Sequence, residues 1–182
     1  MCMPNGGRWL AVLFVALGAG GAGAQDRPTL GEPIAAADLA PWDISIQPDG
    51  TGLPPGAGKA AAGEQIYAAK CIACHGEKGA GQPNDRLVGG QGTLTQLAQV
   101  RTIGSFWPYA TTVFDYIRRA MPFQAPQSLS NDEVYALTAY LLALNGIIGE
   151  NDEMNARTLP RVRMPNRDGF ILAYPERPTP RN

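Results

Sequence analysis

The chain has 182 residues with a formal net charge of −1, and 45% of its residues are hydrophobic. This length allows one ordinary domain with extensions, and the near-neutral balance argues against nucleic acid as a partner. The charge is unevenly distributed. Residues 157–182 hold six arginines and two acids, whereas residues 25–156 hold eight basic and fourteen acidic residues. The basic tail is expected either to dock electrostatically on another protein or to be solvated.

The first 24 residues are expected to form a secretory signal peptide. Arg8 supplies the positive charge, residues 9–19 form an apolar stretch too short to span a bilayer, and residues 22–24 (Ala-Gly-Ala) form a cleavage site. An uncleaved anchor helix is the alternative, and the four glycines between positions 18 and 23 disfavour it. We therefore expect a periplasmic protein that starts near residue 25 and has no membrane span.

Residues 25–58 are predicted to form an extended arm. Six prolines prevent a continuous helix, and the segment lacks the alternation of a strand. The arm is expected either to lie over the domain, with Trp42 and Ile46 holding it to the surface, or to be a partly disordered linker.

Residues 59–72 are predicted to form a helix that runs into the sequence Cys-Ile-Ala-Cys-His at residues 71–75. Gly63 inside this helix would permit a close crossing with another helix. Tyr67 lies four residues further on and therefore shares the face of Gly63.

The Cys-x-x-Cys-His sequence predicts covalent attachment of one haem c. Cys71 and Cys74 are the only cysteines after residue 24, so a disulfide or a redox-active pair are the alternatives. The histidine that follows directly, His75, decides against both. Two thiols one helical turn apart reach the two vinyl groups of a single porphyrin, and the adjacent histidine faces its iron.

The glycine-rich residues 76–100 predict a loop, with at most a short helix near residues 94–100. A backbone carbonyl near Pro83 is expected to accept a hydrogen bond from His75 Nδ1, because ligating histidines need such a partner. Trp107 and Arg101 are expected to contact a haem propionate. A core aromatic ring and a solvated charge are the alternative roles.

Residues 111–120 are predicted to form a second helix, which Pro122 ends.

Because His75 is the only histidine, the second axial iron ligand is methionine, another weak donor, water or none. Met121 stands between the helix and Pro122, whereas Met154 and Met164 lie in the tail, so Met121 is the expected ligand. Its alternative role is that of a flexible core filler. A Met/His pair raises the reduction potential and closes the iron.

The clearest predicted helix covers residues 131–145. Ser130 and Glu133 form a capping box at its start, and Gly146 provides a left-handed cap at its end. Residues 147–182 contain five prolines and are predicted to be irregular, and no section is rich in strands. The sequence therefore predicts an all-α protein.

These features resemble class I cytochrome c, in which the first and last helices cross near a glycine and an aromatic residue, here Gly63, Tyr67 and Tyr140. A longer resemblance, over roughly residues 31–173, is to the cytochrome c subunit of the bacterial sulfane (sulfur) dehydrogenase and sulfite dehydrogenase complexes of thiosulfate oxidation. It is carried by residues 42–44, 48–50, 52–54, 106–112, 114–123, 125–129 and 164–170.

The resemblance implies a single class I cytochrome c domain at residues 59–148, between the arm and a C-terminal extension at residues 149–182. It implies an electron-transfer subunit that is not itself an enzyme. The electrons would come from a molybdenum-cofactor subunit that oxidises a sulfur compound, and would pass to a downstream cytochrome c or oxidase of the respiratory chain. Sulfane dehydrogenase members carry a second haem module, so a monohaem sulfite dehydrogenase subunit or a stand-alone relative fits equally well.

Two other functions fit the sequence less well. A free, diffusible periplasmic electron carrier is the main alternative, and the long extensions count against it. A haem peroxidase or gas sensor needs an open sixth position and an acid–base partner, and the single histidine disfavours it.

Overall fold

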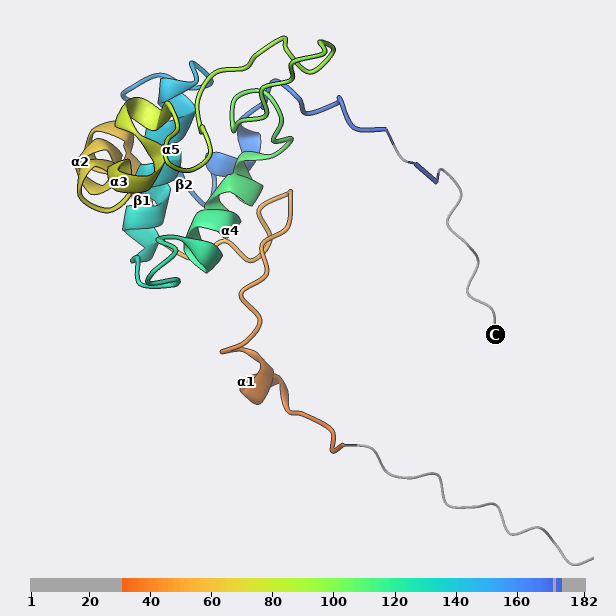
Figure 1. Cartoon of the computed structure of the whole chain (residues 1–182). Coiled ribbons are helices and arrows are strands. Elements are labelled where there is room, and N and C mark those ends of the chain that lie inside the picture. Colours follow the sequence, from red (N-terminus) through yellow and green to blue (C-terminus); the bar gives the residue numbers. More distant parts are fainter. Residues whose placement is uncertain (1–30, 172, 175–182) are drawn as a thin grey trace, which may run out of the picture.

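The structure is a computed structural model that describes residues 31–171, 173 and 174 (Figure 1). The predicted signal peptide lies outside the described residues. The described part is mainly helical, and none of its helices is long and apolar enough to cross a membrane. Its elements, in chain order, are α1 (Ala36–Leu39), β1 (Ala57–Lys59), α2 (Ala60–Lys70), α3 (Ile72–His75), η1 (Glu77–Gly79), α4 (Ala110–Ala120), α5 (Asn131–Leu144), β2 (Glu153–Asn155) and η2 (Leu159–Arg161).

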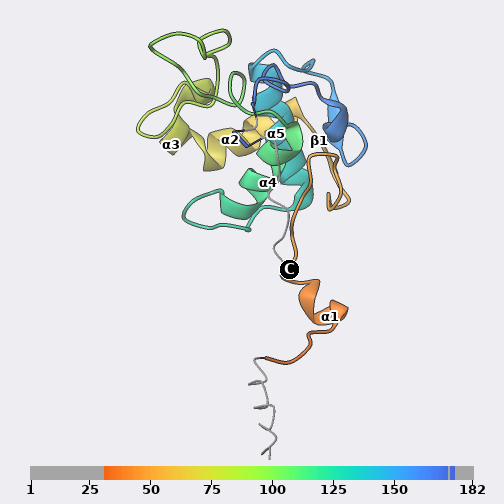
Figure 2. The same cartoon turned by 90° about the vertical axis from the view of Figure 1, so that its right-hand side faces the viewer.

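Helix α5 is the centre of the domain. It packs against α2, α4 and both strands, and it lies in the middle of the domain in Figure 2. Nine of its residues are buried, which is why its sequence is apolar around most of its circumference. The predicted capping box between Ser130 and Glu133 starts the helix, and Gly146 follows its end with a φ of +67°, so both predicted caps are confirmed.

The crossing of α2 over α5 depends on Gly63. A Cβ atom at this position would collide with the backbone carbonyl of Ala136 and with the Tyr140 side chain, so only glycine allows the two helices to approach this closely. Beside the crossing, the rings of Tyr67 and Tyr140 are 5.4 Å apart at 51°. The close crossing predicted at Gly63 is confirmed.

Helix α4 buries one face and ends as predicted. Val113, Phe114 and Ile117 are buried at helical spacing, and the Phe114 ring lies 4.4 Å from that of Tyr135 on α5. The residue after the helix, Met121, has an extended backbone with φ of −121° and ψ of 148°. Pro122 accounts for this, because a residue before proline is driven out of the helical region.

The two extensions meet in a short antiparallel pair, in which Gly58 of β1 faces Met154 of β2. The sequence did not predict these strands, because three residues are too few to show alternation. Further along the tail, Leu159 and Met164 are also buried in the core. The tail up to Met164 is therefore part of the packed domain, although most of it is irregular as predicted. The division of the chain at residues 58 and 148 stays a prediction.

The arm is attached to the domain from Ile44 onward. Ile46 packs against the core as predicted, Thr111 Oγ1 donates to the Pro48 carbonyl (3.3 Å), and Tyr135 Oη donates to the Pro54 carbonyl (2.9 Å). Trp42, however, is 80% exposed, so the prediction that it holds the arm to the surface is wrong. Helix α1 and the chain around it lie away from the domain, as Figure 1 shows.

Gly63→Ala tests the crossing. Alanine is the better helix former, so the substitution would stabilise an exposed helix by up to about 1 kcal/mol. At the crossing we expect it to lower the free energy of unfolding by about 1–3 kcal/mol, because the added methyl group overpacks the contact with Ala136. Denaturant unfolding measures the change. Gln65→Ala on the exposed face of α2 is the control, with an expected change within about 0.5 kcal/mol; a stabilised Gly63→Ala protein would contradict this account of the crossing.

Candidate haem site

One cavity of about 530 Å³ opens between α2, α3, α4, α5 and the loops that follow α3. This volume is typical of pockets that hold small molecules and cofactors. The cavity is lined mainly by apolar side chains, among them Leu137 and Leu141 of α5. All six residues singled out from the sequence line it: Cys71, Cys74, His75, Arg101, Trp107 and Met121.

The Cys-x-x-Cys-His residues occupy one helical turn at the cavity wall. Cys71 stands at the junction of α2 and α3, and its N–H donates to the Tyr67 carbonyl (2.9 Å). The N–H groups of Cys74 and His75 both donate to the Cys71 carbonyl, at 3.1 and 3.0 Å. This turn brings two thiols and one imidazole to the same cavity, and both cysteines are free.

The environment of Cys71 does not suit a redox-active thiol. Burial raises the pKa of Cys71 to about 11, and the neighbouring Cys74 adds to this effect while Lys70 opposes it. Reactive cysteines of redox motifs have lowered pKa values instead. A half-buried, protonated Cys71 in an apolar wall therefore favours covalent attachment over redox chemistry.

The imidazole of His75 is held in one tautomer. Its Nδ1 lies 2.9 Å from the carbonyl oxygen of Asp85. A carbonyl only accepts, so Nδ1 carries the proton and Nε2 keeps a free lone pair for a metal. The sequence placed this carbonyl near Pro83, and the structure assigns it to Asp85. The N–H of Asn84 donates in turn to the Cys74 carbonyl (2.8 Å), which holds the loop against the Cys-x-x-Cys-His turn.

The loop after His75 is also held by Tyr67, whose hydroxyl donates to the Gly76 carbonyl (2.9 Å). Burial, with a smaller effect from Cys71, raises the pKa of Tyr67 to about 12, so the phenol stays protonated and remains a donor. The side chain that shares the helix crossing thus also braces the wall of the cavity.

Of the three methionines among the described residues, Met121 alone lines the cavity. Met154 and Met164 are buried in the core, with exposures of 4% and 1%. Met121, directly after α4, and His75, at the end of α3, therefore border the same space. These are the two donor types that c-type haem iron takes in a closed site.

Trp107 and Arg101, which were expected near the propionates, border the cavity, and each also contacts other side chains. The Trp107 ring lies edge-on to Tyr116, with ring centres 5.6 Å apart. The Arg101 guanidinium donates to Gln99 Oε1 (2.9 Å) and lies 5.3 Å from the centre of the Phe106 ring.

Two further basic residues that the sequence did not single out, Lys70 and Arg86, also line the cavity. Cationic side chains at the rim suit the anionic propionates of a haem. With the free Nε2 of His75, the thioether of Met121, the two thiols and the apolar walls, the residues present fit a haem c.

Asn145 braces the cavity wall and was missed in the sequence. Its Oδ1 accepts from the Gly89 N–H (2.9 Å), and its Nδ2 donates to the carbonyls of Leu141 (2.8 Å) and Leu87 (3.3 Å). Thr102 Oγ1 donates to the Gly89 carbonyl from the other side. Since Leu87 and Thr102 line the cavity, the amide ties the end of α5 to this wall. From the sequence, an asparagine after a helix predicts only a helix cap. The partners of Asn145 lie 56 and 58 residues away, so no local pattern indicates its contacts with the loop.

Asn145→Ala is expected to lower the free energy of unfolding by about 1–3 kcal/mol, because it removes the partner of a partly buried N–H and leaves carbonyl groups of the wall unsatisfied. Thermal or denaturant unfolding of the holoprotein measures the change. Gln96→Ala, at an exposed loop position, is the matched control and should stay within about 0.5 kcal/mol. Equal stability of the two variants would show that the amide does not brace this wall.

Comparisons with known proteins agree with the site. The family model described as cytochrome c oxidase, cbb3-type, subunit III matches residues 58–141. No curated protein sequence matches the chain. Among solved structures, the chain is similar to a chain of the crystal structure of the sulfane dehydrogenase SoxCD from Paracoccus pantotrophus, with 40% sequence identity, a TM-score of 0.74, and coverage of 82% of this chain and 73% of that chain.

The likeness reaches well beyond the haem-binding core. A coverage of 82% corresponds to about 149 residues of this chain, and residues 44–182 number only 139, so the match includes residues before Ile44. The expected all-α class I cytochrome c fold, covalently bound haem c and a role in electron transfer rather than catalysis are confirmed. The chain therefore belongs to the family of c-type cytochrome subunits represented in the sulfane dehydrogenase SoxCD.

Proposed function

We propose that this protein is a monohaem cytochrome subunit that accepts electrons from a molybdenum-cofactor dehydrogenase subunit and passes them to the respiratory chain through a downstream cytochrome c or oxidase. The observation that carries the proposal is the 40% identity to the SoxCD chain over 82% of this sequence. The substrate of the partner would be sulfite or sulfane sulfur. The proposal includes the predicted signal peptide at residues 1–24 and a periplasmic location.

Within the cavity, Cys71 and Cys74 are proposed to hold the haem through thioether bonds, and His75 and Met121 to be the axial ligands. All four residues border the same cavity, which supports this assignment. The haem supplies a one-electron Fe(III)/Fe(II) couple. The Asp85 carbonyl accepts from Nδ1 of His75 and would leave Nε2 to bind the iron.

The same residues would limit what the site can do. If His75 and Met121 both bound the iron, the site would leave no open coordination position for a peroxide or a gas. The apolar walls of α5 exclude water and, together with the methionine, favour the reduced state. Arg101 and Trp107 are proposed to contact the propionates. The chain would hold, insulate and tune the electron carrier, while the partner oxidises the sulfur compound.

Met121→Leu tests the ligand assignment. Leucine keeps the volume but has no sulfur, so we expect loss of the sulfur-to-iron absorption band in the far-red spectrum of the oxidised protein and a lower reduction potential. Met164→Leu is the matched control, because Met164 is buried in the core and does not line the cavity. The assignment is wrong if the band persists in Met121→Leu or is missing from the wild type.

Isolation of the native complex tests the partner. The cytochrome drawn from native periplasm under mild conditions is expected to bring down a molybdenum-containing subunit, at a size-exclusion mass above the 19.3 kDa of the chain. Recovery of the cytochrome alone, at its own mass, would favour the free diffusible carrier over the subunit.

A further inference from the structure

We infer that residues 31–43, called here the distal arm, are a docking segment that inserts into the dehydrogenase subunit of the proposed function, on which this inference rests. The distal arm contains α1 and carries three acids and no basic residue. It projects from the domain in both views of the chain (Figures 1 and 2). No proposed haem contact lies in it.

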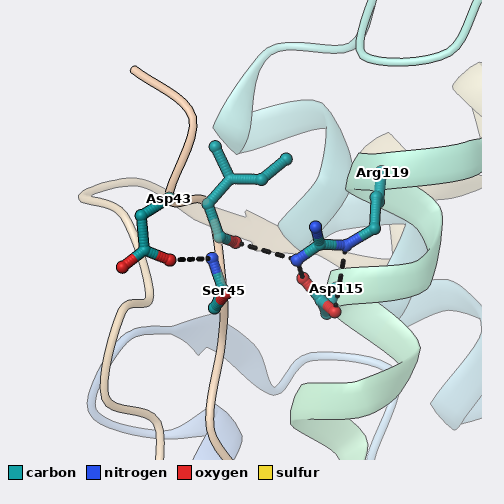
Figure 3. Close-up of polar contacts among 5 residues, drawn as sticks. Asp43, Ser45, Asp115 and Arg119 are labelled. Atoms are coloured by element: carbon teal, nitrogen blue, oxygen red, sulfur yellow. Dashed lines mark hydrogen bonds and ion pairs between the residues drawn. The ribbon is translucent and has the colours of Figure 1, made fainter. Parts of the chain in front are cut away.

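The anchored part of the arm begins directly after this segment. Arg119 of α4 donates from Nη2 to the Ile44 carbonyl (3.1 Å), and its guanidinium is held by two hydrogen bonds to Asp115, one turn earlier, at 2.8 and 3.3 Å. Asp43 accepts from the Ser45 N–H (3.2 Å), which shapes the exit of the chain (Figure 3). This clamp fixes the direction in which the distal arm leaves the domain.

The distal arm presents apolar side chains that the domain does not cover. Ile34, Leu39 and Trp42 are 62%, 47% and 80% exposed, and α1 buries none of its residues. The backbone-to-backbone hydrogen bonds of residues 35–43 are made only among residues 35–44. A helix of four residues is not stable in water by itself. Among the described residues nothing covers these side chains, and we infer that a partner molecule buries them.

The chemistry of the distal arm defines the surface that would receive it. A tryptophan flanked by aliphatic side chains is the typical anchor of a stable interface, and it fits an apolar groove. Glu32, Asp38 and Asp43 are best matched by basic groups at the rim of that groove. Since the likeness to the SoxCD chain includes residues before Ile44, at least part of the segment is shared with a dehydrogenase structure.

A second copy of this chain is the less suitable occupant, although its tail is basic. Arg163 already forms an ion pair with Asp168 (2.6 Å), and Arg167 lies 4.4 Å from the centre of the Tyr109 ring. The large apolar cavity among the described residues is assigned to the haem, so it is not free to receive the tryptophan of a second copy. The dehydrogenase subunit is therefore the occupant that we propose.

The experiment measures the affinity of the full-length holocytochrome for the purified dehydrogenase subunit by titration calorimetry, for the wild type, Trp42→Ala and Leu39→Ala. We expect Trp42→Ala to raise the Kd at least tenfold, as for a buried aromatic anchor, with unchanged haem spectra and thermal stability. Leu97→Ala is the control, because Leu97 is a fully exposed apolar residue outside the arm, and its Kd should stay within twofold of the wild type. Asp38→Lys should also weaken binding, most strongly at low salt.

The outcomes separate this inference from the function it rests on. Wild-type protein that neither binds the subunit nor receives its electrons overturns both. Tight binding by the wild type and equally tight binding by Trp42→Ala overturn the docking segment alone. Sedimentation of the cytochrome alone tests whether a second copy is the occupant. If the wild type is a dimer that Trp42→Ala dissociates, and dehydrogenase binding is unchanged, the distal arm joins two copies of this chain instead.

Discussion

The contact of Gly63 with the backbone of Ala136 is the constraint on which the haem site depends. It brings α2 against α5, and the turn of Cys71 and His75 follows directly at the end of α2. An ion pair between Lys70 and Glu133 (2.7 Å) links the same two helices close to the motif. Because α4 packs on α5 as well, the segment that ends in Met121 is placed by the same helix. The two proposed iron ligands thus take their positions from one central helix.

The division of work between protein and cofactor follows from this arrangement. The walls of the cavity are apolar, its rim is cationic, and both proposed axial ligands are protein side chains. Such a site is suited to electron transfer and not to binding a substrate. The chain outside the core then has a different task. Residues 44–60 and the tail up to Met164 pack on the domain, while the acidic distal arm, our proposed docking segment, projects away from it.

Local signals predicted most of the fold. The capping box at Ser130, the left-handed Gly146 and the proline after Met121 each act within a few residues. Gly63 contacts a distant helix, but a glycine inside a helical pattern is itself a local signal of close packing. The features that were missed depend on partners far along the chain. Strands β1 and β2 pair across 96 residues, and Asn145 reaches loops more than 50 residues away. The prediction for Trp42 was wrong because a large apolar side chain favours burial, but the sequence does not show which surface would cover it.

We propose that electrons reach this haem from a sulfur compound oxidised in another subunit. The decisive measurement is stopped-flow absorbance of the oxidised holocytochrome, mixed with sulfite or thiosulfate in the presence and absence of the purified molybdenum subunit. We expect rapid appearance of the reduced haem spectrum only when the subunit and its substrate are both present. Equal reduction without the subunit, or none in its presence, would contradict it.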